Sequence, residues 1–439
     1  MRPACALLAA ALVAGPAHGS VFDVYGFTPR ARALGNALTA DADDYTGTFY
    51  NPAMLTRRKR VNVGAGLVAT FPRLQIDRRY QADFQREIEN ELPDDFTGIS
   101  FGALFPLGGR FGNRVAIGFG LYLPLLRLLR ADSVDPQVPQ FYRYEALPDK
   151  FVVLASVAFE PVDGFSVGAG VQVLASLDGQ LDFGVEVGNR RVSRREILVE
   201  IFPTAAPVFG LAWTPAAGLR LGASFRGAIQ LDYALPGHID IDTLLQLDLA
   251  LSGTVLYTPD IYNLGVAWDV PGAGVTLTAD ASFARWSRAP DPSPHVALDV
   301  GGEIVDGLGA GERLDIGSGA PVDLAFRDVL ELKAGAEYLP HPRFALRAGY
   351  TWRPSPAPVP TTAFNYIDND AHLLAAGFGV TFADPLEVRR NPVTLDFVYQ
   401  ATLMSEVAVH KAAGADDRVG DYTAGGVVHS IGLAFRHDL

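Results

Sequence analysis

The feature that most constrains this chain is the alternation of apolar and polar residues in many separate segments. The apolar side of RFALRAGYTW (343–352) holds Phe344, Leu346, Ala348, Tyr350 and Trp352. Small, polar or charged residues occupy the other side, and VTLTADASF (275–283) alternates in the same way. A period of two places successive side chains on opposite faces of a strand, so each segment predicts a β-strand with one apolar face.

The hydrophobic content is high, yet it is spread over these short segments. Hydrophobic residues make up 49% of the 439 residues, and charged residues make up 19%. After the first 20 positions no run of 18 or more apolar residues occurs, so the sequence offers no candidate for a membrane-spanning helix. Strands that face lipid on one side and a lumen on the other accommodate this composition, which predicts an all-β transmembrane barrel.

Short turns alternate with long loops rich in proline and charge, as is typical of outer-membrane barrels. The short turns are 106–113, 161–164, 214–218, 270–274 and 339–343, and the long segments are 71–97, 124–149, 288–325, 354–370 and 404–424. About 14 antiparallel strands are predicted, at 61–70, 98–107, 114–123, 150–160, 165–175, 196–213, 219–230, 260–269, 275–286, 328–338, 343–353, 372–382, 393–403 and 425–436. Further extended sequence at 176–195 and 231–258 is interpreted as strand extensions and loop hairpins above the membrane, which leaves the count open by two.

The amino terminus has the pattern of a secretory signal peptide. Residues 1–19 combine a positive start, an apolar centre and small residues before an expected cleavage at Ser20. Cys5 is the only cysteine and lies inside this signal, so we expect no disulfide and no cysteine-based metal site after cleavage. The net charge of −13 argues against nucleic acid as a partner.

The segment between the signal and the first strand is irregular. Fourteen strands enclose a lumen that is too wide for wall side chains alone to fill. We therefore expect residues 20–60 to form a hatch (plug) inside the lumen and residues 61–439 to form the barrel.

Three stretches in this order resemble the FadL/TodX family of outer-membrane transporters of long-chain fatty acids and other hydrophobic compounds. They are ALGNALTADADDYTGTFYNPAML (33–55), YNLGVAWDV with VTLTADASFARWSR (262–288), and FRDVLELKAGAEYLPHPRFALRAGYTWRPSPAPVP with DNDAHLLAAGFGVTF (326–382). The resemblance implies a hatch with the motif Asn51, Pro52 and Ala53, a monomer, and location in the outer membrane of a Gram-negative bacterium. It also implies passive uptake, in which a hydrophobic ligand such as a long-chain fatty acid enters from the loops and leaves sideways into the bilayer.

A lateral exit needs a strand that bends away from its neighbour. The strand RVAIGFGLYLP (114–124) has Gly118 and Gly120 on its expected lumen face and ends at Pro124. Such residues weaken or interrupt a ladder, so this strand is the candidate for the lateral gap. Simple clearance inside the lumen is the alternative explanation for the two glycines.

The segment PLLRLLRADSVDPQVPQFYRY (124–144) is the candidate for ligand capture, because it combines apolar surface with cations. The candidate residues are Leu125, Leu126, Arg127, Leu128, Leu129, Arg130, Phe141, Tyr142 and Arg143. In the alternative interpretation the leucines pack the loop itself, and the arginines contact the phosphates of lipopolysaccharide in the surrounding outer-membrane lipid.

Alternation also places several charges on the lumen side of the later strands. They are Asp280, Glu331, Lys333, Glu337, Arg347 and Asp396. Buried charges are retained when they are paired, so we expect a structural network, with Asp43, Asp44 and Asn51 of the hatch as partners.

Other functions use the same pattern. A general porin for small polar solutes is the main alternative, although it would have little use for a hatch. The histidines after the signal show no metal spacing and no Ser-His-Asp order that stands out, so we expect no catalytic site, no metal and no cofactor. The chain ends GLAFRHDL rather than on an aromatic residue, so the barrel-assembly machinery would have to recognise Phe435 or a less typical signal.

Overall fold

The computed structural model describes residues 21–78, 90, 92–125, 137–145, 151–186, 191–241, 245–291, 295–301, 316–317, 323–383, 391–415, 417 and 419–439. The predicted signal peptide lies outside these residues. Within the described ranges, no helix is long and apolar enough to cross a membrane.

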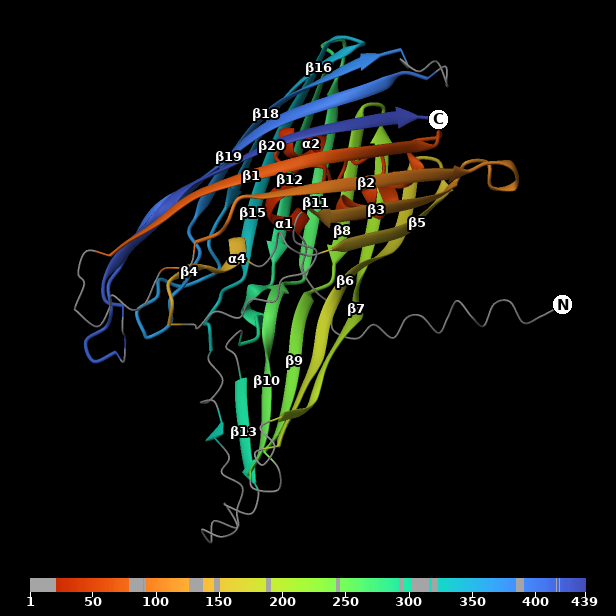
Figure 1. Cartoon of the computed structure of the whole chain (residues 1–439). Helices are drawn as coiled ribbons and strands as arrows, with labels where there is room; N and C mark the ends of the chain where they lie inside the picture. The colour runs from red at the N-terminus through yellow and green to blue at the C-terminus, as the bar shows by residue number, and fades with distance from the viewer. Residues whose placement is uncertain are drawn as a thin grey trace, which may run out of the picture.

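A barrel of 14 antiparallel strands dominates the described part of the chain (Figure 1). Its strands are β1 (Asn62–Arg78), β2 (Phe96–Leu107), β3 (Val115–Pro124), β5 (Val152–Val162), β6 (Phe165–Glu186), β7 (Arg191–Ala216), β8 (Leu219–Arg226), β11 (Ile261–Val270), β12 (Val275–Ala284), β15 (Val329–His341), β16 (Phe344–Arg353), β18 (Ala371–Phe382), β19 (Val393–Val409) and β20 (Tyr422–Asp438). Each strand pairs with the next, and β20 pairs with β1 along its whole length. This closure gives every edge a partner, as hydrocarbon requires, and confirms the predicted fold class.

The apolar side of the alternating segments points outward. Along β16, for example, Leu346 and Tyr350 are exposed whereas Ala345, Arg347 and Thr351 are buried. In a soluble protein such a continuous exposed apolar surface would be a liability, but on a barrel it is the surface that contacts lipid.

The same sheet extends beyond the barrel on the side of the long loops. The extension contains the outer parts of β6 and β7 together with β9 (Ile229–Ile241), β10 (Leu245–Thr258), β13 (His295–Gly301) and β14 (Ile316–Gly317) (Figure 1). The described parts of the extended sequence at 176–195 and 231–258 therefore form strand extensions and a hairpin, as expected. Nearer the barrel, β4 (Gln140–Phe141) pairs in parallel with β17 (Tyr366–Ile367) and ties two of the long loops together.

The hatch occupies the lumen as a series of short helical turns. They are α1 (Val21–Tyr25), α2 (Pro29–Ala33), α3 (Gly47–Tyr50) and the 3-10 turn η1 (Pro52–Thr56), which Figure 1 shows in red within the barrel. Phe22, Phe27 and Phe49 pack edge to face or tilted against one another, and nearly every described side chain from Phe22 to Thr56 is buried. The hatch and the inner wall thus form one packed core.

Close contact between the hatch and the wall depends on glycine. A Cβ atom at Gly349 of β16 would overlap the backbone nitrogen of Gly35, and one at Gly222 of β8 would overlap the carbonyl oxygen of Thr39. The wall can approach the hatch backbone here because neither position carries a side chain.

Candidate functional site

The Asn-Pro-Ala motif joins the hatch to the wall. The Asn51 amide nitrogen donates to the carbonyl oxygens of Thr39, at 2.7 Å, and Leu211 of β7, at 2.9 Å. The Asn51 side-chain oxygen accepts from the Ala53 backbone N–H at 3.1 Å and so caps η1, whose first residue is Pro52. The motif therefore starts a turn and holds it against β7.

An ion-pair network lies near the short-turn, periplasmic end. Asp396 of β19 accepts from Arg347 and from Arg436, both at 2.6 Å, and Arg436 also contacts Asp44 of the hatch at 3.0 Å. Arg347 further donates to Glu337 at 2.5 Å. Three of the expected lumen charges, Glu337, Arg347 and Asp396, thus belong to this network, and they alternate in sign so that each buried charge has a partner.

The hatch contributes its own arginine to this network. Arg30 contacts Asp41 at 2.6 Å and Glu337 of the wall at 3.4 Å, and Asp41 in turn contacts Arg220 of β8 at 2.7 Å. Although burial opposes it, the guanidinium groups of Arg58 and Arg30 hold the pKa of the Asp43 carboxyl below its usual value. The hatch is thus attached to the wall by charges that come from both sides.

The other three expected lumen charges lie apart from this network. Asp280 accepts from the Thr39 backbone N–H at 2.8 Å. Lys333 donates to Ser282 at 2.8 Å, and Glu331 lies 3.7 Å from Lys333. Lys333 and Glu331 belong instead to a pocket closer to the outer end of the barrel.

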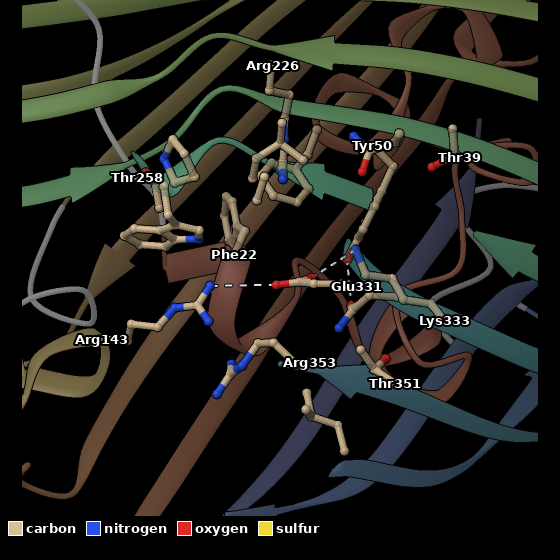
Figure 2. Close-up of a pocket in the computed structure, with 18 residues that line it drawn as sticks. Phe22, Thr39, Tyr50, Arg143, Arg226, Thr258, Glu331, Lys333, Thr351 and Arg353 are labelled. Carbon is tan, nitrogen blue, oxygen red and sulfur yellow. Dashed lines mark hydrogen bonds and ion pairs between the residues drawn. The ribbon is translucent and has the colours of Figure 1, made fainter. Parts of the chain in front are cut away.

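This inner pocket lies between the hatch and the outer ends of several strands (Figure 2). Its lining residues are Phe22, Asn36, Thr39, Phe49, Tyr50, Arg143, Arg226, Thr258, Pro259, Ile261, Asn263, Ala284, Trp286, Glu331, Lys333, Thr351, Arg353 and Leu373. Its free volume of about 40 Å³ suits a small polar group rather than a whole long-chain molecule.

Positive charge dominates the described lining of the inner pocket. Four cationic side chains, Arg143, Arg226, Lys333 and Arg353, share the pocket with one carboxylate, Glu331, which Figure 2 shows between Arg143 and Lys333. Glu331 lies 3.6 Å from Arg143. A second carboxylate, Asp368, lies 3.4 Å from Arg143 just outside the lining. With four cationic side chains beside Glu331, the lining itself favours an anionic group from a ligand.

Aromatic rings hold the three arginines in place. The Arg226 guanidinium carbon lies 3.9 Å from the Phe49 ring centroid, and the equivalent distance from Arg143 to Trp286 is 4.8 Å. Arg353 donates to the Tyr144 hydroxyl and lies 5.4 Å from the centroid of that ring, while its Nε atom has no hydrogen-bond partner within the described residues. Such stacking fixes a guanidinium while leaving N–H groups for an anion.

The expected capture segment is only partly described. Arg143 lines the inner pocket and Phe141 is fully buried, whereas Tyr142 packs against loop aromatics and Leu125 is exposed. The remaining candidates, Leu126, Arg127, Leu128, Leu129 and Arg130, lie outside the described residues. Ligand capture by this segment stays a prediction.

Two arginines of the pocket were absent from the sequence-based candidates. Arg226 is the last residue of β8, and Arg353 is the last residue of β16. Arg353 follows Arg347 by six positions, so the alternation that places Arg347 on the lumen face also places Arg353 there. The alternation could therefore have identified Arg353 as a lumen residue, but Arg353 stands at the end of the predicted strand, where the predicted loop begins.

Gly118 and Gly120 lie in a strand that is paired on both sides. The ladder of β3 with β2 runs from Val115 to Pro124, and that with β5 runs from Val115 to Tyr122. An added Cβ would lie 2.6 Å from Thr48 at Gly118 and 2.8 Å from Phe27 at Gly120. Clearance for the hatch therefore accounts for both glycines, and a lateral gap here would require this ladder to open.

Among the described residues, no group of three or more His, Cys, Asp or Glu side chains is placed to hold a metal ion.

Comparison with known proteins identifies the family. Residues 9–437 match the family model of the outer membrane protein transport protein (OMPP1/FadL/TodX). The chain is 23% identical to alkane uptake protein A of Marinobacter nauticus over 406 residues, which cover 88% of this chain and 84% of that protein.

Solved structures support the same fold. A Pseudomonas aeruginosa FadL homologue superposes with a TM-score of 0.56 at 16% identity, covering 94% of this chain and 97% of the other. The P. putida toluene transporter TodX gives a TM-score of 0.58 at 14% identity, with 95% and 99% coverage. With a closed barrel, an internal hatch and a family match over nearly its whole length, the chain belongs to the OMPP1/FadL/TodX family of outer-membrane transport proteins.

Proposed function

We propose that this outer-membrane protein takes up amphipathic hydrophobic compounds with an anionic headgroup, of which long-chain fatty acids are the simplest example. The observation that carries the proposal is the inner pocket, where Arg143, Arg226, Lys333 and Arg353 surround one carboxylate. A neutral hydrocarbon offers these side chains no hydrogen-bond acceptor, whereas a carboxylate would accept charge-assisted hydrogen bonds from them.

The path would be one of passive diffusion. A hydrophobic chain gains roughly 0.8 kcal/mol per methylene on leaving water, so exit through the wall into the bilayer avoids returning it to the periplasm. The packed hatch supports this path over an open channel, because its core residues Ala31, Leu34 and Leu55 are fully inaccessible. The same packing argues against a general porin. We expect the barrel to act as a monomer.

A neutral hydrocarbon is the second candidate cargo. The relatives named for alkane and toluene support it, as do the aromatic side chains Phe22, Phe49 and Trp286 that share the inner pocket with the cations. In that case the arginines would stabilise the barrel wall and the loops and would not bind the ligand.

Uptake measurements separate the two cargoes. A Gram-negative host without its own transporter of this type would express the chain and receive radiolabelled palmitate or hexadecane. Replacing Arg353 by Met should lower palmitate uptake at limiting concentration by about 10- to 100-fold, since losing a charged hydrogen bond costs about 1.5–3 kcal/mol. Hexadecane uptake should not change.

Arg114→Met is the matched control, because this arginine lies at the periplasmic end and is about half exposed in its pair with Asp163. If the intact chain takes up hexadecane but not palmitate, the cargo is a neutral hydrocarbon and the proposal of an anionic cargo is wrong. Uptake of small sugars by the intact chain would favour a porin.

A further inference from the structure

One arginine of the hatch is buried without a carboxylate beside it. Arg32 of α2 is 2% exposed, and among the described residues it forms no ion pair. In the same part of the chain its one hydrogen-bond acceptor is the Ser430 hydroxyl of β20, and its Nε atom has none. Arg30 of the same helix differs, because it contacts Asp41 and Glu337. A guanidinium has five N–H donors, so Arg32 keeps donors and a charge that an anion would satisfy.

The wall beside Arg32 carries a second buried polar side chain of this kind. Gln400 of β19 is 1% exposed, and within the described residues neither its amide nitrogen nor its amide oxygen has a hydrogen-bond partner. Gln400 is paired with Ser430 in the ladder of β19 with β20, so the two buried side chains are neighbours on the lumen face. A Cβ added at Gly432 would lie 3.1 Å from the Nη1 atom of Arg32. The guanidinium therefore lies against β20 at the level of Ser430 and Gly432, next to Gln400.

This pair of side chains adjoins the inner pocket. Asn36 and Tyr50 line the inner pocket, and the Tyr50 hydroxyl donates to the Asn36 side-chain oxygen at 2.8 Å. A Cβ added at Gly26 would lie 2.2 Å from that same oxygen and 2.6 Å from the Cγ atom of Arg32. Asn36 therefore borders both the inner pocket and the side chain of Arg32.

The charge of Arg32 argues for an anion rather than for water alone. Water can complete the hydrogen bonds of Arg32 and Gln400, but it leaves a buried positive charge without compensation. A carboxylate supplies the opposite charge, and its two oxygens can accept from the guanidinium and from the Gln400 amide.

We propose that Arg32, with Gln400 beside it, forms a second carboxylate site between the hatch and the wall, which takes the headgroup of the transported acid after it leaves the inner pocket. The inference rests on the proposed function, because an uncharged cargo has no headgroup for this site. The two sites act at different steps. The inner pocket binds the acid first, whereas the Arg32 site accelerates the step that follows binding.

The concentration dependence of palmitate uptake would test the site in the same host. Arg32→Met should lower the maximal rate of palmitate uptake about tenfold, because a charged hydrogen bond is lost after binding. The half-saturating concentration and hexadecane uptake should stay the same, since the inner pocket is unchanged. Arg32→Lys keeps the charge and should restore part of the lost rate.

Gln400→Leu is a second variant that leaves the charge of the hatch in place. It should lower the maximal palmitate rate about threefold, because a hydrogen bond from a neutral amide contributes less than one from a guanidinium. Gln172→Leu is the matched control and should change nothing. Gln172 is 3% exposed, and its amide nitrogen also has no hydrogen-bond partner within the described residues, but it lies on β6. Heat-modifiable mobility on gels reports whether each variant assembles, and Gln400→Leu decides if Arg32→Met does not.

The outcomes separate this inference from the proposed function. Equal losses of palmitate and hexadecane uptake in Arg32→Met, or no loss of either, would overturn the second site, whereas palmitate uptake that depends on Arg353 would still support the function. Equal effects of Gln400→Leu and Gln172→Leu would also overturn it. If the intact chain takes up hexadecane but not palmitate, the proposed function and the second site are both wrong.

Discussion

Burial should decide how much each ion pair of the network contributes to stability, and two carboxylates near the periplasmic end make a matched test. Asp396 is 1% exposed at its side chain and accepts from Arg347 and Arg436, both at 2.6 Å. Asp438 accepts from Arg58 at 2.7 Å, yet its side chain is 26% exposed. The same Asp→Asn change at both positions therefore compares similar distances at different burial.

The expected costs differ by several kcal/mol. Asp396→Asn leaves two buried guanidinium groups without their shared carboxylate, and breaking a buried pair costs about 3–5 kcal/mol. Asp438→Asn should cost at most about 1 kcal/mol, because water and salt screen a partly exposed pair. A loss of about 3 kcal/mol lowers the folded-to-unfolded ratio roughly 100-fold.

Urea titration in lipid vesicles, read by gel mobility of the folded barrel, would measure both free energies of unfolding. Asp396→Asn combined with Arg436→Gln should recover part of the loss, because it removes one of the two guanidinium groups that lost the shared carboxylate, while Asp44 keeps its hydrogen bond from the Thr46 backbone N–H. Equal costs for the two single variants, or a larger cost at Asp438, would refute the argument from burial.

Three further predictions concern the hatch. The pKa of Asp43 is held low by Arg58 and Arg30, so its stabilising contribution should be complete at neutral pH and fade as pH falls below about 4; Asp43→Asn should reduce this acid loss in a urea titration at pH 3. Gly349→Val would insert a side chain into the backbone of Gly35 and should lower thermal stability by several degrees. Gly108→Val is the control, because Gly108 is exposed, has no positive φ, and an added Cβ would meet only the Asn113 side chain, at 3.3 Å. Deletion of residues 20–58 behind the signal should admit small sugars in a swelling assay; unchanged hydrophobic uptake without sugar entry would contradict the hatch as a plug.

Local periodicity explains why the strands could be predicted. The alternation in residues 343–352 requires one face in lipid and one in the lumen, and β16 extends from Phe344 to Arg353. The hatch could also be predicted, because fourteen strands enclose a lumen that wall side chains alone cannot fill, and an irregular segment precedes the first strand. The lumen side of Glu337 and Asp396 followed from the same alternation, although their partners Arg30 and Arg436 did not.

The make-up of the pocket above the hatch depends on tertiary structure. The inner pocket combines Phe49 of the hatch, Arg143 of a loop, Arg226 of β8 and Arg353 of β16, which are far apart in sequence. Alternation determines the face on which a side chain lies, but it cannot determine which strand ends and loops meet above the hatch. That choice depends on barrel closure and on loop packing, both of which are long-range contacts. Sequence therefore determined the barrel, its hatch and the lumen side of its charges, whereas only the folded chain brought the four cations of the inner pocket together.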